Sequence, residues 1–102
     1  MRVKLSLRAQ QRARIITTWW RKHRPGGEEV FEQELVHMID RLALMSPRGP
    51  VGTVDGTHRG KPTWRILLPR TKQYLFYEID EAKETVVVIM IWGARRGHRP
   101  GR

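Results

Sequence analysis

The part of the sequence that decides the fold is its last third, which reads Trp64-Arg-Ile-Leu-Leu-Pro-Arg70, then Gln73-Tyr-Leu-Phe-Tyr-Glu-Ile79, then Thr85-Val-Val-Val-Ile-Met-Ile-Trp-Gly-Ala-Arg-Arg-Gly97. Each run is rich in β-branched and aromatic residues, and turn-forming residues separate the runs. The pattern predicts three strands in an antiparallel meander, with turns at 70–72 and 80–84. Because residues 86–91 are apolar on both faces, we expect this last strand to be central and covered on both sides.

The first third of the chain predicts a short strand followed by a helix. Residues 2–5 alternate as a strand does, and Ser6 is a suitable N-cap for a helix that runs to about residue 22. The helix carries an apolar stripe at i, i+4, i+7 and i+11, widened by two neighbours. Its residues are Ala9, Ala13, Ile16 and Trp20, with Ile15 and Trp19 beside them. Since Trp19 and Trp20 are adjacent, we expect one to be buried and the other exposed.

A second amphipathic helix is predicted after the helix-stopping residues 25–27. It begins near Glu28 and Glu29, where the helix dipole favours acids, and it carries an apolar stripe of the same spacing. The stripe consists of Phe31, Leu35, Met38 and Leu42. The short link between the two helices predicts an antiparallel hairpin. Residues 46–62 contain three prolines and four glycines and are expected to form one irregular loop, which leaves His58 with no predicted partner.

These elements together predict an α+β fold of order β-α-α-β-β-β, with the helical hairpin packed on a small antiparallel-meander sheet. A length of 102 residues fits a single domain over 1–102, in which the Gly- and Pro-rich segment 97–102 is expected to fray. Tyr77 shares a strand face with Leu75 and Ile79, so it is interpreted as a core residue.

The composition is strongly basic, because the net charge is +10 and arginine supplies 15 of the 20 basic residues. Such a charge favours a nucleic-acid, anionic-surface or acidic protein partner, although a solvated, self-repelling surface has the same composition. The chain has no cysteine, which excludes disulfides and thiolate chemistry. No apolar segment approaches the roughly 20 residues that a membrane helix needs. We therefore expect a cytoplasmic protein with no membrane contact.

The tracts at residues 64–70, 74–80 and 88–96 resemble the ParE/RelE superfamily of bacterial type II toxins, and the resemblance is specific over residues 63–96. It implies a small toxin that is neutralised by an antitoxin whose disordered acidic segment folds across it. It also implies two possible targets. The RelE-like branch cleaves mRNA on the ribosome, whereas the ParE-like branch inhibits DNA gyrase.

The residues at the end of the last strand favour the ParE-like branch. Arg65 and Arg70 match the strand-borne cations of the nucleases, but Trp92 stands where nucleases often carry His or Tyr. An indole N–H cannot exchange a proton usefully, and the nearby His98 lies in the Gly- and Pro-rich tail. We therefore predict a gyrase inhibitor without enzymatic activity. The alternative is a metal-independent mRNA endonuclease with Arg65, Arg70 and His98 as its catalytic candidates.

A partner or target is expected to contact the cations of the sheet end and the tryptophan beside them. The predicted binding residues are Arg65, Arg70, Trp92, Arg95 and Arg96. No two histidines have the spacing of metal ligands, and no cofactor or metal is predicted. A third possibility, from another class, is a basic nucleic-acid-binding module without toxicity, which a steep dependence of binding on salt would indicate.

Overall fold

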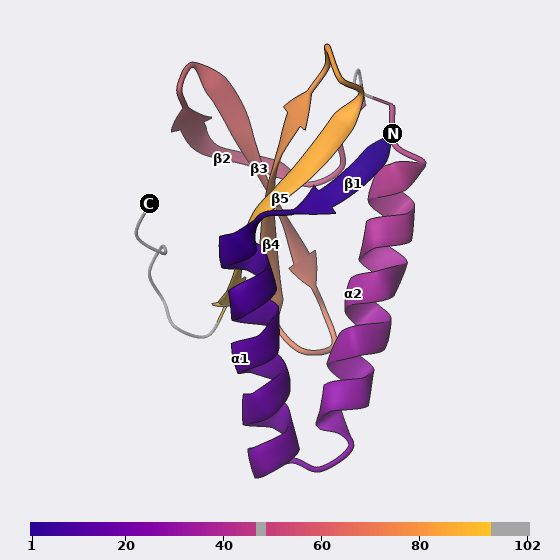
Figure 1. The fold of residues 1–102 in the computed structure, drawn as a ribbon, viewed down its shortest axis with the longest axis vertical. Helices are drawn as coiled ribbons and strands as arrows, with labels where there is room; N and C mark the ends of the chain where they lie inside the picture. Colours follow the sequence, from indigo (N-terminus) through magenta and orange to yellow (C-terminus); the bar gives the residue numbers. More distant parts are fainter. Residues whose placement is uncertain (47–48, 95–102) are drawn as a thin grey trace.

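The sheet has five strands in the order β1-β5-β4-β3-β2, with β1 parallel to β5 and every other pair antiparallel. The computed structural model describes residues 1–46 and 49–94 (Figure 1). The elements are β1 (Arg2–Leu5), α1 (Leu7–His23), α2 (Gly27–Ala43), β2 (Thr53–His58), β3 (Lys61–Leu68), β4 (Gln73–Asp80) and β5 (Thr85–Gly93). This arrangement confirms the α+β fold and contains one strand more than the sequence predicts.

The two helices form an antiparallel hairpin that packs on one face of the sheet (Figure 1). The central strand is β4, whereas β5 lies between β1 and β4. The expectation that residues 86–91 form the central strand of the sheet is therefore wrong. Residues 86–91 are all apolar because β5 buries side chains on both of its faces. Val86 and Val88 belong to the helix-facing core, whereas Met90 is buried on the other face of the sheet, where Phe76 is its cross-strand partner.

The additional strand β2 lies inside the segment for which the sequence predicts a loop. His58 pairs with Lys61 across a two-residue turn in which Arg59 and Gly60 both have positive φ, at 53° and 78°. Two positive φ values are the signature of a type I′ turn, whose twist suits a tight hairpin. The register also shifts between Val54 and Thr57, which marks a bulge. The glycines of this segment therefore shape a bulged edge strand.

The helix-facing core follows the stripes that the sequence predicts. Ala9 and Ile16 of α1 are buried, and the partly buried Ala13 and Trp20 pack beside them. The stripe of α2, from Phe31 to Leu42, is buried along its whole length. No helix of residues 1–46 and 49–94 combines the length and hydrophobicity needed to span a bilayer.

The predicted widening of the α1 stripe by Ile15 and Trp19 is wrong, since these side chains are 52% and 49% exposed. Both side chains face the space between α1 and the turn that joins β3 to β4, outside the helix-facing core. Trp20 is the inward tryptophan, as expected for one of the pair. A Cβ atom at Gly27 would lie 2.6 Å from Cε3 of Trp20, so only glycine lets the helical link approach this ring.

Ser6 joins the start of α1 to β5. Its Oγ accepts a hydrogen bond from the Ala9 N–H at 3.1 Å, as predicted for an N-cap. The same hydroxyl donates to the carbonyl of Ile89 at 3.2 Å, and the Ser6 N–H donates to the carbonyl of Val88. One residue therefore caps the helix and continues the pairing of β1 with β5.

A buried carboxylate joins α2 to the turn between β3 and β4. Glu34 is 8% exposed and accepts three hydrogen bonds from this turn. The donors are the Arg70 N–H at 2.6 Å, the Thr71 N–H at 3.0 Å and the Thr71 Oγ1 hydroxyl at 2.6 Å. Because these donors satisfy the charge, the carboxylate is buried with no salt bridge to a cation of the described residues.

We expect Glu34→Gln to lower the free energy of unfolding by about 2–3 kcal/mol, because a neutral amide offers one acceptor oxygen to three donors. Urea denaturation followed by circular dichroism measures the change. Glu32→Gln is the matched control, because Glu32 is exposed on the same helix and its replacement should cost less than about 0.5 kcal/mol. Equal effects of the two substitutions would contradict the role given to Glu34.

Tyr77 is a fully buried core residue, as the sequence predicts, and its hydroxyl donates to the carbonyl of Val51. Burial raises the pKa of the Tyr77 phenol to about 12, although the hydrogen bond to Val51 and the charge of Arg41 act in the opposite direction. A buried phenol cannot ionise without losing its solvation, so the folded state holds the proton at pH values where the unfolded chain has released it.

The free energy of unfolding should therefore fall as the pH rises from about 10, where an unfolded phenol titrates, to about 12, by up to about 3 kcal/mol in total. Stability from this group is complete below pH 10 and is lost as the pH approaches the raised pKa. Urea denaturation across this range measures the fall. Tyr77→Phe should be less stable at neutral pH but should lack this fall in the free energy of unfolding. If the free energy of unfolding falls equally steeply with pH in the two proteins, the assignment is contradicted.

Candidate functional site

The face of the sheet opposite the helices presents a cluster of cationic, aromatic and acidic side chains. Leu75 and Tyr77 point into the helix-facing core, so the alternate residues of β4 and their cross-strand partners occupy the other face. We call this surface the helix-free face. Its residues include Arg65, Tyr74, Phe76, Glu78, Met90 and Trp92.

Two cations lie over aromatic rings on this face. The guanidinium carbon of Arg65 is 4.6 Å from the ring centroid of Tyr74, and that of Arg12 is 4.8 Å from the ring of Trp92. Tyr74 and Trp92 are direct cross-strand partners. The four side chains therefore form a row in which a cation stands at each end of an aromatic pair, within the range of cation–π attraction.

Arg12 reaches this face because β1 is shorter than β5. The β1 pairing covers β5 only from Thr85 to Val88, so in the part of the chain that the structure describes no strand lies beside the outer edge of the rest of β5. Arg12 extends from α1 across this edge, and its Nε–H donates to the carbonyl of Ile91 at 3.2 Å. Arg12 is a site residue that sequence reasoning missed, because a basic residue on a predicted helix does not indicate which strand its side chain will contact.

A second polar cluster lies on the same face, beside β2. The Nδ1 of His58 is 3.2 Å from Oε2 of Glu78, and the Thr63 hydroxyl lies 3.5 Å from the same oxygen. The His58 side chain is 47% exposed and that of Glu78 is 19% exposed. The expectation that His58 has no partner is wrong, because the β2–β3 hairpin brings it over the sheet.

A groove of about 370 Å³ lies between α1 and the turn that joins β3 to β4. Its wall includes the exposed Ile15 and Trp19, and four basic residues contribute to its lining. These are Arg12, Arg24, Arg70 and Lys72. The Glu34 carboxylate fixes the turn on one side, and α1 forms the other side. We call this feature the α1 groove.

The predicted binding residues therefore lie on two surfaces. Arg65 and Trp92 occupy the helix-free face, whereas Arg70 lines the α1 groove. Arg12 contacts both surfaces, since it lies over the Trp92 ring and also lines the groove. The predicted residues Arg95, Arg96 and His98 lie outside the described residues.

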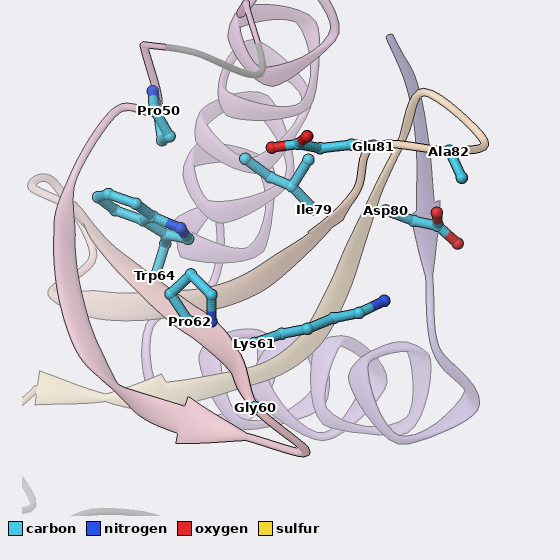
Figure 2. Close-up of a pocket in the computed structure, with 9 residues that line it drawn as sticks. All are labelled: Pro50, Gly60, Lys61, Pro62, Trp64, Ile79, Asp80, Glu81 and Ala82. Atoms are coloured by element: carbon cyan, nitrogen blue, oxygen red, sulfur yellow. The ribbon is translucent and has the colours of Figure 1, made fainter.

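A further cavity of about 400 Å³ lies at the opposite end of the sheet (Figure 2). The indole of Trp64 and two prolines form one wall, and acidic residues of the β4–β5 turn form the other. Its described lining contains Lys61, Asp80 and Glu81, but no histidine or hydroxyl group. Among residues 1–46 and 49–94, no three His, Asp or Glu side chains are grouped to hold a metal ion. The helix-free face and the α1 groove are therefore the candidate site.

No protein-family model and no curated protein matches this sequence, but solved structures are similar to it. A chain of the chromosomal ParDE TA system from P. aeruginosa superposes with a TM-score of 0.72 at 14% identity, over 91% of this chain and 95% of that one. The chain has the RelE/ParE toxin fold. The isolated E. coli RelE toxin gives a TM-score of 0.51 at 22% identity, over 97% of this chain and 86% of RelE.

The RelE/ParE fold is also shared with an E. coli RelE mutant in complex with a peptide of its antitoxin. This superposition has a TM-score of 0.52 at 20% identity and covers 99% of this chain and 97% of RelE. All three identities are low, so the likeness concerns the fold. It confirms the architecture that the tracts in residues 63–96 predict.

We expect Arg12→Met to lower the free energy of unfolding by about 1–2 kcal/mol, because methionine keeps the apolar stem but loses the bond to Ile91 and the contact with Trp92. Arg14→Met is the control, since Arg14 is exposed on the same helix. Urea denaturation of the two variants measures the difference. If both variants match the parent protein, Arg12 does not fix the end of β5.

Proposed function

We propose that this chain is the toxin of a type II toxin–antitoxin module, that it resembles ParE, and that it inhibits DNA gyrase in the cytoplasm. The observation that carries the proposal is the superposition on the ParDE chain, with a TM-score of 0.72. The corresponding values for the two RelE structures are 0.51 and 0.52. Fold similarity supports the toxin class, and the difference between the scores favours the ParE-like branch.

The partner is an acidic antitoxin segment that orders on binding. The net charge of +10 and the cations of the candidate site favour such a segment electrostatically. The RelE relative forms a complex with an antitoxin peptide. The expected contacts on this chain are Arg65, Arg70, Trp92, Arg95 and Arg96.

Inhibition acts through shape and charge in this proposal. Trp92 is the penultimate residue of β5 and its ring lies beneath the Arg12 guanidinium, and neither side chain exchanges a proton near neutral pH. The Arg65 guanidinium lies over Tyr74 in the same way. Such a row suits binding of an anionic or acidic surface better than proton transfer.

One observation favours the second candidate function, which is RelE-like cleavage of mRNA on the ribosome. His58 and Glu78 form an imidazole–carboxylate pair on the face that carries Arg65. Such a pair can act as a general base, and a guanidinium on the same face can stabilise a developing negative charge. His58 replaces His98 as the first residue to test for this activity.

Two assays with the purified chain separate these functions. We expect it to inhibit supercoiling of relaxed plasmid by gyrase and to leave a defined message intact on translating ribosomes. Codon-positioned cuts together with normal supercoiling would overturn the gyrase proposal. In that case His58→Ala should slow cleavage by about 10²–10⁴-fold, the usual loss for a missing acid or base. Arg14→Met is the control that should leave either activity unchanged.

A further inference from the structure

We propose that the α1 groove binds single-stranded DNA, with a base stacked on Trp19 and the backbone phosphates held by the basic residues of the groove. The site shares Arg70 with the expected antitoxin contacts, but its aromatic platform, Trp19, is not among them. The inference rests on the proposed function only in the choice of DNA over RNA, because gyrase acts on DNA.

The aromatic platform is fixed before a ligand arrives. Trp19 is 49% exposed, and one face of its ring stacks on His23 with centroids 4.5 Å apart and planes 16° from parallel. The His23 ring is itself held by a contact of 2.9 Å between its Nδ1 and the Trp19 carbonyl. Trp20 meets the Trp19 ring edge to face, with centroids 5.1 Å apart. A nucleobase would extend this stack at little cost in side-chain entropy.

The phosphate-binding charges come from three separate parts of the chain. Arg12 and Arg24 belong to α1 and its C-cap, and Arg70 and Lys72 belong to the turn after β3. Within residues 1–46 and 49–94, no carboxylate side chain lines the groove. Glu34 lies under the same turn, but its oxygens accept hydrogen bonds from Arg70 and Thr71. The field in the groove is therefore positive, and the cations flank the apolar platform.

The geometry favours a single strand over a duplex or an acidic peptide. A groove of about 370 Å³ is the size of a small-ligand pocket, and bases reach a stacking platform only when they are unpaired. Arg12 continues the positive surface from the groove to Trp92, beside which Tyr74 and Arg65 complete the row. Alternating cations and aromatic rings match the alternating phosphates and bases of a single strand. An acidic peptide would use the cations of the groove but has no need of the stacked aromatic rings.

The test is fluorescence anisotropy of the whole chain with a labelled oligothymidylate, at several salt concentrations. If four cations neutralise phosphates, the logarithm of the affinity should fall with the logarithm of salt at a slope of about −3. Trp19→Ala should weaken binding by about 5- to 150-fold, and Trp19→Phe should restore most of the loss. Arg24→Gln should make the slope shallower by about 0.7. Arg14→Gln, on another part of α1, is the charge-matched control.

Two further ligands of equal length make the result decisive. An oligouridylate that binds more tightly than the DNA would overturn the choice of DNA. A polyglutamate that competes equally, together with a Trp19→Ala variant that keeps full DNA affinity, would overturn the stacking site and favour an acidic peptide. Circular dichroism verifies that each variant is folded. Gyrase inhibition is measured separately, so its absence with intact DNA binding overturns the proposed function and leaves the groove site standing.

Discussion

The arrangement of this molecule depends on the hydrogen bonds between the Glu34 carboxylate and the β3–β4 turn. Burying a carboxylate costs free energy unless strong donors replace its water, and here two backbone N–H groups and a hydroxyl do so. The same contacts fix α2 against the end of the sheet. Because α1 packs on α2, they also set the width of the α1 groove and the position of Arg70 in it.

The helices could be predicted from the sequence because each carries one apolar stripe with clear end signals. Ser6 supplies the N-cap, and α1 ends at His23, just before the predicted stop at residues 25–27, although Gly27 already belongs to α2. The strands from β3 to β5 could be predicted equally well, since their β-branched and aromatic residues are bounded by turn residues. The core position of Tyr77 followed from the alternation of side chains along β4.

The contacts of the candidate site were harder to predict because they depend on register. β2 contains a glycine among polar residues, and its turn requires a positive φ at Arg59, which local sequence does not signal. If this hairpin is not predicted, nothing in the sequence places His58 next to Glu78. The contact between Arg12 and Trp92 was hard to predict for the same reason, because it requires β1 to stop at Leu5 while β5 continues. The cations that were predicted from sequence, Arg65 and Arg70, proved to lie on different surfaces.

The parallel pairing of β1 with β5 has a consequence for how the protein is made. Ser6 and Ile89, which meet at this junction, are 83 positions apart in the chain. During synthesis the helical hairpin is complete long before its sheet exists, because local contacts form first and this distant pairing must wait for the last strand. The two surfaces joined by Arg12 are therefore assembled only near the end of translation, so a nascent chain lacks the complete binding surface.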